Sequence, residues 1–187
     1  IRTWRDYLYY KEDLQLFAGR RYSGQRNHIK KFYAQWPNAE FRPISAKADA
    51  GAIEQFWGDF KAEFPKDSGS KAMAELELSK KMMAMPDKPW LLRGGMFDGE
   101  KLIALSLCEK CGETLIIHIE KADIAYEGIY QVLVNEYAKC FVTPDVRYIN
   151  REEDVGDEGM RRSKESYHPV RLLEKYLVRI PAQPEKG

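Results

Sequence analysis

Residues 148–169 concentrate the side chains of this chain that could do chemistry. The stretch reads Tyr-Ile-Asn-Arg-Glu-Glu-Asp-Val-Gly-Asp-Glu-Gly-Met-Arg-Arg-Ser-Lys-Glu-Ser-Tyr-His-Pro, and six acids and four bases lie between Arg151 and Ser166. A carboxylate here could accept a proton from an amine or a hydroxyl, and a neighbouring cation could hold a phosphate or a carboxylate. Most charge runs are solvated faces instead, so the position of this stretch in the fold decides between the two interpretations.

A second polar cluster lies at the end of an apolar strand predicted over residues 114–120. In that strand Leu115, Ile117 and Ile119 should share one face, and the end of the strand carries His118, Glu120 and Lys121. A helix separates it from a strand at 147–150, and such a crossover is normally parallel and right-handed. Both strands should therefore end at one edge of the sheet, where open α/β sheets bind ligands. We expect the two polar clusters to meet in one crevice.

Transfer of an acyl group to an amine or hydroxyl needs a base for the acceptor and donors for the developing oxyanion. The candidate bases are Glu120, Glu152 and His118. Each has a structural alternative, which is an ion pair for the carboxylates and a hydrogen-bonded core position for the histidine. The remaining candidates would bind substrate, and they are Lys121, Asn150, Arg151, Glu153, Arg161, Lys164 and Tyr167.

Composition limits the class of protein. The 187 residues are enough for one domain with a full core, and 44% hydrophobic with 32% charged residues is ordinary for a soluble protein. A net charge of +1 gives no global argument for nucleic acid or membrane. Three cysteines favour a reducing, cytoplasmic setting, and the lone Cys108-x-x-Cys111 pair is too weak a signal for a metal site. No signal peptide is evident, and the first residue, Ile1, indicates a processed or cut piece.

Hydrophobic periodicity predicts an α+β fold, with a central mixed sheet flanked by helices. We predict a helical linker, or a remnant of a first lobe, over 1–37, the main domain over 38–180 and a tail over 181–187. The expected strands are 40–44, 90–97, 102–108, 114–120, 147–150 and 172–180, and the expected helices of the main domain are 49–64, 70–85, 126–141 and one before Pro169.

The first 37 residues carry a basic, aromatic helix. Its apolar face should pack into the core, because Ile29, Phe32, Tyr33 and Trp36 recur at i, i+3, i+4 and i+7. Its cations could meet RNA, including tRNA, or they could form a solvated helix face. They are Arg20, Arg21, Arg26, Lys30 and Lys31.

The order of elements resembles the GNAT (GCN5-related N-acetyltransferase) fold, and three motifs narrow the match. They are His118-Ile-Glu-Lys-Ala122, Gly128-Ile-Tyr-Gln-Val-Leu-Val-Asn-Glu136 and the stretch at 148–169. Together they resemble an uncharacterised bacterial family that is grouped with the C-terminal domain of phosphatidylglycerol lysyltransferases. The resemblance implies a cytoplasmic, GNAT-like acyltransferase of the aminoacyl type, with aminoacyl-tRNA as donor. It also implies an N-terminal GNAT-like lobe that this chain lacks.

One segment departs from the classical GNAT pattern. GNAT enzymes hold the pyrophosphate of acyl-CoA on a glycine-rich loop that opens a helix. The corresponding residues 121–128 contain one glycine and two acids, Asp123 and Glu127, which would repel a pyrophosphate. Aminoacyl-tRNA, or no donor at all, fits this loop better than acyl-CoA. The alternative is a non-catalytic lobe that binds an anionic small molecule, RNA or a protein partner.

Overall fold

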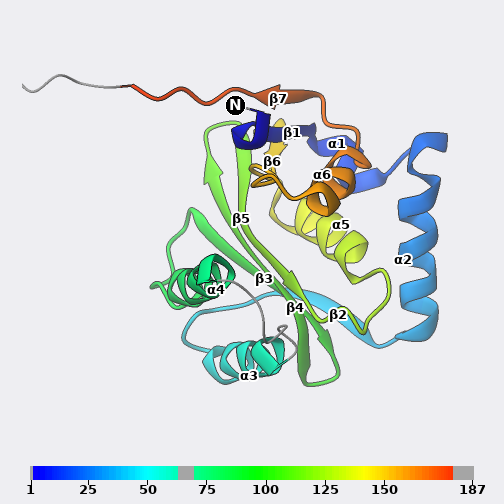
Figure 1. The fold of residues 1–187 in the computed structure, drawn as a ribbon. Helices are drawn as coiled ribbons and strands as arrows, with labels where there is room; N and C mark the ends of the chain where they lie inside the picture. The colour runs from blue at the N-terminus through cyan, green and yellow to red at the C-terminus, as the bar shows by residue number, and fades with distance from the viewer. Residues whose placement is uncertain (1, 63–69, 179–187) are drawn as a thin grey trace, which may run out of the picture.

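A computed structural model describes residues 2–62 and 70–178, which form a seven-stranded mixed sheet covered by helices (Figure 1). The strand order is β2-β3-β4-β5-β6-β1-β7. The strands are β1 (Asp6–Tyr10), β2 (Ala39–Pro43), β3 (Leu91–Asp98), β4 (Lys101–Cys111), β5 (Thr114–Ala122), β6 (Tyr148–Asn150) and β7 (Arg171–Leu173). The helices are α1 (Lys11–Leu16), α2 (Ser23–Gln35), α3 (Ala50–Ala62), α4 (Ser70–Met83), α5 (Ile129–Phe141) and α6 (Glu158–Glu165). The expected α+β fold class is confirmed.

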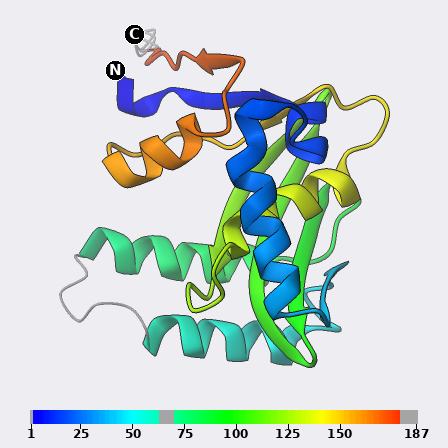
Figure 2. The same ribbon diagram turned by 90° about the vertical axis from the view of Figure 1, so that its right-hand side faces the viewer.

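The helices form two layers, one on each face of the sheet. The helices α1, α2 and α5 cover one face, while α3 and α4 cover the other (Figures 1 and 2). Each layer has its own apolar cluster, the larger around α5 and the smaller around α3 and α4. None of the helices in the described residues is both long and apolar enough to cross a membrane.

The predicted crossover is confirmed, because β5 and β6 are parallel and α5 connects them. Their pairing is short and runs only from Thr114 opposite Tyr148 to Ile116 opposite Asn150. The strand β5 then continues to Ala122 without β6 beside it. The sheet therefore opens between these two strands, at the edge where the two polar clusters were expected to meet.

A β-bulge at His118 sets the direction of the side chains along the open part of β5. Cys108 of β4 pairs with Ile117 and the preceding Leu107 pairs with Ile119, which leaves His118 as the extra residue. A bulge of this kind reverses the alternation of faces. Ile117 consequently packs in the α5 cluster, but Ile119 packs in the α3–α4 cluster. The expectation that the two isoleucines share a face was wrong, and the bulge turns Glu120 toward α5.

The N-terminal segment was wrongly expected to be helical throughout. Residues 6–10 form β1, which lies antiparallel between β6 and β7. Tyrosines fit the pleated surface of a strand well, and the strand partners lie about 140 residues away, where local periodicity gives no signal. The sheet therefore continues across the boundary that was predicted at residue 37. The helical prediction holds for α2, whose Phe32 is buried in the main core.

Two further expectations differ from the structure. The Cys108–Cys111 pair, which we expected in the turn between the strands at 102–108 and 114–120, lies within β4, with Cys108 buried and Cys111 exposed. The described residues contain no group of three or more residues suited to a metal ion. The last strand is shorter than predicted, since β7 ends at Leu173, and the predicted tail at 181–187 lies outside the described residues.

The helix α2 packs directly on the N-terminal end of α5. Gly128, which precedes α5, has a φ of 86° that favours glycine. A Cβ atom at this position would lie 2.9 Å from the carbonyl oxygen of His28 in α2. Beside this contact the rings of Trp36 and Tyr126 pack with their centroids 4.8 Å apart.

We predict that Gly128→Ala lowers the free energy of unfolding by about 1–3 kcal/mol, because the new methyl group is strained and meets the α2 backbone. Urea unfolding followed by circular dichroism measures the change. Gly58→Ala in α3 is the matched control, since a Cβ there would meet nothing within 4 Å, and this variant should be neutral or slightly more stable. Equal midpoints for the two variants would contradict the close packing of α2 on α5.

Candidate active site between β5 and β6

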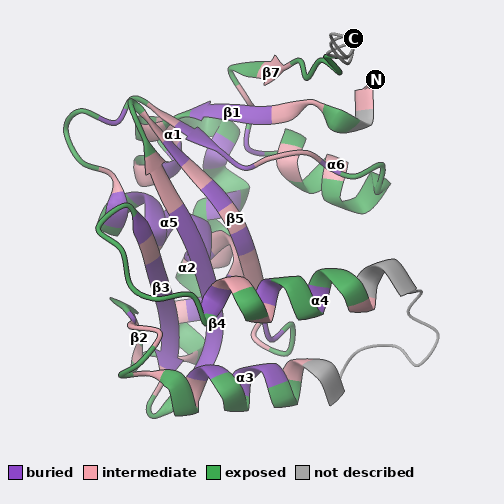
Figure 3. Ribbon diagram, turned by 90° about the vertical axis from the view of Figure 1, so that its left-hand side faces the viewer, coloured by how far each residue is buried: buried purple, intermediate pink, exposed green. Residues whose placement is uncertain are grey.

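A cleft of about 720 Å³ lies where β5 runs on past the end of β6. One face of α4 forms one wall, and the loop after β6 together with α6 forms the opposite wall. Figures 2 and 3 show α4 and α6 facing each other on the same side of the molecule. The cleft brings together residues from both polar clusters, and they are His118, Glu120, Lys121, Arg151, Glu152, Glu153 and Lys164.

Glu120 and Arg151 form a bidentate ion pair at the bottom of this cleft. The Arg151 Nε atom lies 2.8 Å from Oε1 of Glu120, and Nη2 lies 2.6 Å from Oε2. Their side chains are only 14% and 5% exposed. Burial opposes the charge on Glu120, but Arg151 and the Tyr137 hydroxyl, which donates at 3.0 Å, hold the pKa of this carboxyl below its usual range. Such a carboxylate is a weak proton acceptor, so the geometry favours a structural role for Glu120.

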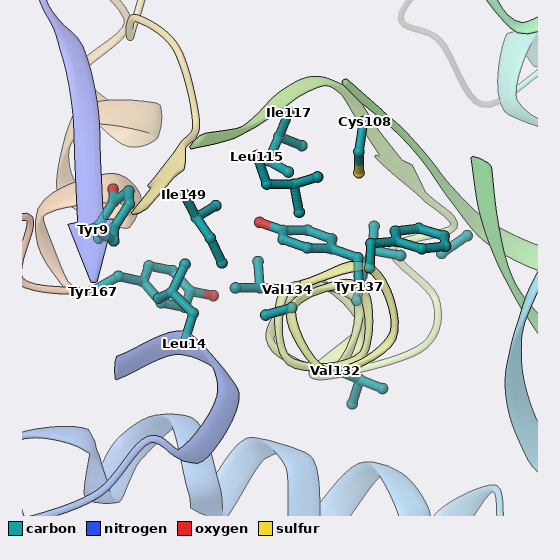
Figure 4. Packing of buried hydrophobic residues seen from close by; sticks show 14 of the residues in the cluster. Tyr9, Leu14, Cys108, Leu115, Ile117, Val132, Val134, Tyr137, Ile149 and Tyr167 are labelled. Atoms are coloured by element: carbon teal, nitrogen blue, oxygen red, sulfur yellow. The ribbon is translucent and has the colours of Figure 1, made fainter. Parts of the chain in front are cut away.

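Aromatic rings support the Arg151 guanidinium. Its central carbon lies 4.6 Å from the centroid of the Tyr167 ring and 5.9 Å from that of Tyr9. Figure 4 shows Tyr9, Tyr137 and Tyr167 together in the core around Ile149. The Tyr167 side chain, an expected substrate-binding residue, is buried in this packing and is not among the residues that line the cleft.

Lys164 holds the loop that follows β6. Its Nζ atom donates to three successive backbone carbonyls, those of Arg151 at 2.5 Å, Glu152 at 3.3 Å and Glu153 at 2.6 Å. Partial burial and the nearby Arg151 charge lower the pKa of Lys164 to about 8. The same loop places Glu152 at a φ of 53°, a left-handed conformation that is strained for a residue with a side chain. The three carbonyl contacts explain how this conformation is maintained.

His118 lies between two carboxylates. Its Nδ1 atom is 2.9 Å from Oε1 of Glu152, and its Nε2 atom is 2.9 Å from Oε2 of Glu109. Both ring nitrogens must donate to satisfy both carboxylates, which describes the charged imidazolium. The hydrogen bond to Glu152 is the largest cause that raises the pKa of His118. The structure therefore favours a role for His118 in orienting Glu152, whose side chain is 38% exposed in the cleft.

Two predicted site residues act on the loop from outside the cleft. The Asn150 amide donates to Asp6 at 3.1 Å, and its oxygen accepts from the Glu152 backbone at 2.8 Å. Arg161 donates to Asp154 at 2.8 Å, and Tyr7 donates to the same carboxylate at 2.7 Å. These hydrogen bonds hold the pKa of the buried Asp154 well below its usual range.

Asp154 and Glu109 also belong to this arrangement, although neither was predicted as a site residue. Asp154 is fully buried, although it stands in a run of exposed-type charges that gave no signal for burial. Glu109 lies on β4, opposite Ile116, and only sheet pairing brings it to His118. The last two predicted residues are paired at the rim, Lys121 with Glu75 at 2.6 Å and Glu153 with Lys175.

The structure does not offer the cradle that acyl-CoA would need. In the GNAT pattern the pyrophosphate would lie at the N-terminal end of α5, but α2 covers this end at Gly128. The preceding loop is engaged as well, since Asp123 pairs with Lys101 at 3.0 Å and its carboxylate accepts from the Ala125 backbone at 3.0 Å. The residues present therefore do not fit a bound pyrophosphate.

We predict that Glu120→Gln lowers the free energy of unfolding by about 3 kcal/mol, because it leaves the Arg151 charge buried without its partner. Chemical denaturation at pH 7 measures the loss. Glu153→Gln removes a carboxylate only at the rim and serves as the control, with an expected change below about 0.5 kcal/mol. A Glu120→Gln variant as stable as the wild type would contradict the structural role of the ion pair.

We predict a pKa above the usual value of about 6.5 for His118 and a fall toward that value in Glu152→Gln. Because the folded pKa is raised, the stabilisation from His118 is complete below pH 6.5 or so and is lost as pH rises through the folded pKa. An NMR titration of the imidazole Cε1 proton measures both variants. Glu153→Gln should leave the titration unchanged, and a His118 pKa at or below the usual value would refute the arrangement.

Comparisons with known proteins agree with this architecture. The family model described as the C-terminal part of phosphatidylglycerol lysyltransferase matches residues 1–179. A conserved Bacteroides thetaiotaomicron protein of unknown function has a crystal structure that superposes with a TM-score of 0.76 at 29% identity, over 92% of this chain and 58% of that one. The structure of L-PGS from Bacillus licheniformis gives 0.60 at 12% identity, over 91% of this chain and 58% of that one.

An uncharacterised protein of Mycoplasmoides gallisepticum is 22% identical over 175 residues, which are 94% of this chain and 56% of that protein. The chain thus spans a little over half the length of these relatives. Since the family model covers nearly the whole chain, and the mixed sheet matches the solved domains, the assignment rests on sequence and fold together. The chain belongs to the phosphatidylglycerol lysyltransferase C-terminal family and has its GNAT-like fold.

Proposed function

We propose that the cleft transfers an acyl group of the aminoacyl type from an ester donor to an amine or hydroxyl acceptor. The observation that carries this proposal is the carboxylate of Glu152, which is half-exposed in the cleft. Its backbone is held by Asn150 and Lys164, and its side chain is held by His118. A general base needs this combination of access and fixed position. Membership of a lysyltransferase family supports the same class of reaction.

In this mechanism Glu152 accepts the proton of the acceptor as the acceptor nitrogen or oxygen attacks the acyl carbonyl carbon. A bond forms between these two atoms, and the ester bond to the donor oxygen breaks. Glu152 passes the proton to the departing donor oxygen, so the carboxylate is regenerated and charge balances. Lys164 also lines the cleft; its three N–H groups are taken by backbone carbonyls, so it favours the negative charge that develops on the carbonyl oxygen through its positive charge alone and not by a hydrogen bond.

The donor in this proposal is aminoacyl-tRNA, since α2 covers the place of an acyl-CoA pyrophosphate. Of the basic residues expected to contact tRNA, Arg21 pairs with Asp13 and Arg26 donates to backbone carbonyls. Arg20, Lys30 and Lys31 are exposed. They lie on α2 or just before it, across the sheet from α4, so a tRNA bound to them would reach the cleft around the β7 edge of the sheet.

We predict that Glu152→Gln slows transfer about a hundredfold, because the acceptor loses its base, while the fold is retained. The assay supplies a mixture of aminoacyl-tRNAs with radiolabelled amino acids. It measures the transfer of the label from the tRNA to phosphatidylglycerol or spermidine. Glu153→Gln, one residue further along the same loop, is the matched control and should keep most of the wild-type rate.

A wild-type rate for Glu152→Gln would reject Glu152 as the base. A wild-type protein that binds tRNA or an anionic small molecule but transfers nothing would instead support the alternative, in which this lobe binds without catalysis. Loss of tRNA binding on changing Lys30 and Lys31 to alanine, with a weaker salt dependence, would assign the RNA contact to α2.

A further inference from the structure

We infer that the cleft binds an uncharged, aliphatic part of its ligand between its two walls. This inference deepens the proposed function and rests on it for the identity of the transferred or accepted group. The first observation is the composition of the walls. Leu78 and Met82 of α4 face the cleft from one side, and Val155 and Met160 face it from the other. Leu78, Val155 and Met160 are 57%, 67% and 40% exposed.

The apolar side chains on α4 belong to one helical face. The residues of α4 that line the cleft are 75, 78, 79 and 82, which follow the i, i+3, i+4, i+7 pattern. The facing wall comes from α6 and the loop before it (Figure 3). Two apolar surfaces that face each other across an open cleft form a binding surface for an apolar group, because a monomer rarely leaves such surfaces exposed together.

The second observation is that each carboxylate lining the cleft lies next to a cation, although the Nη1 atom of Arg151 has no hydrogen-bond partner among the described residues. The four lining carboxylates have cationic partners, which are Lys121 for Glu75, Arg151 for Glu120, His118 for Glu152 and Lys175 for Glu153. The remaining lining cation, Lys164, is bound to three backbone carbonyls. Among the described residues that line the cleft, every carboxylate thus has a cationic partner already, and none is free to receive an ammonium group.

These observations predict how the cleft discriminates between charged and aliphatic ligand groups. A cationic side chain, such as the lysyl group, would lose hydration between Leu78 and Met160 without gaining an ion pair. An aliphatic chain of the same length would remove apolar surface from water on both walls. An uncharged aliphatic group of this kind could be the side chain of an aminoacyl group or the hydrocarbon chain of an acceptor. Probes of the two kinds distinguish these origins.

The test is a binding titration with three probes, norleucinamide, lysinamide and octanamide. Norleucinamide matches lysinamide except for the ε-ammonium group, and octanamide is an alkyl chain without an α-amine. Methyl NMR signals of Met82 and Met160 report binding in the cleft, and buried Met96 serves as the internal control. We expect norleucinamide or octanamide to bind with a dissociation constant about tenfold below that of lysinamide. Tighter norleucinamide binding indicates an aminoacyl side chain, and tighter octanamide binding indicates a hydrocarbon chain.

A wall variant sharpens the test. Leu78→Glu places a free carboxylate on the α4 wall and should abolish or reverse the preference against lysinamide, whereas Leu78→Gln, of the same size, should not. Leu16→Glu on exposed α1 controls for a general effect of added charge. Lysinamide binding to the wild type as tightly as norleucinamide would overturn the inference, and so would the absence of any Met82 or Met160 response to all three probes.

The outcomes also separate this inference from the proposed function. Selective binding of an uncharged probe without any transfer would reject the transferase proposal and leave the chemistry of the cleft as inferred. Transfer that prefers a lysyl donor, together with tighter lysinamide binding, would keep the transferase and reject the aliphatic specificity.

Discussion

The ion pair between Glu120 and Arg151 is the contact on which the candidate site depends. The ladder between β5 and β6 stops at Ile116 and Asn150, and beyond that point no backbone hydrogen bonds join the two strands. The bidentate pair spans the opening immediately after it. Burying two charges is costly unless their hydrogen bonds are satisfied. Here the Tyr137 hydroxyl donates to Glu120 and the ring of Tyr167 packs on Arg151, while the Nη1 atom of Arg151 is buried without a hydrogen-bond partner among the described residues. The pair thus links β5 directly to the loop after β6 where the backbone ladder has ended.

The other charged residues around this pair are of two kinds. Some hold the loop after β6 in place, and others present a side chain in the cleft. Lys164 gathers three carbonyls of the loop after β6, and Asp154 fixes the following turn by accepting from the Gly156 backbone and from Arg161. These contacts support the left-handed conformation of Glu152 and present its carboxylate in the cleft. Strain at a residue that the surroundings hold so firmly is typical of functional positions. Our proposal therefore places the chemistry on Glu152, whose side chain is 38% exposed, and gives the less exposed His118 an orienting role.

The position of α2 changes the function that the fold would otherwise suggest. A GNAT-like sheet usually implies an acyl-CoA site at the helix after the fourth strand, but in this chain α2 occupies that end of α5. The open cleft lies elsewhere, between α4 and α6, where β5 runs on past the end of β6. The fold and the family thus agree on a GNAT-like acyltransferase scaffold, while the packing of α2 on α5 does not fit a bound pyrophosphate and the apolar walls of the cleft are the basis of the aliphatic ligand that we infer.

The sequence by itself determined the order of elements after residue 38, the parallel crossover from β5 to β6, the meeting of the two polar clusters and the family. These features depend on local periodicity and on the handedness of the crossover, both of which are encoded in short segments. Tertiary structure alone decided that β1 joins the sheet, that His118 forms a bulge which reverses the faces of β5, and that Asp154 is buried. The physical reason is that strand partners and burial are set by residues distant in sequence. Glu120 and Glu152 look equivalent as carboxylates in the chain, and only their environments, one closed around Arg151 and one open to the cleft, separate structure from chemistry.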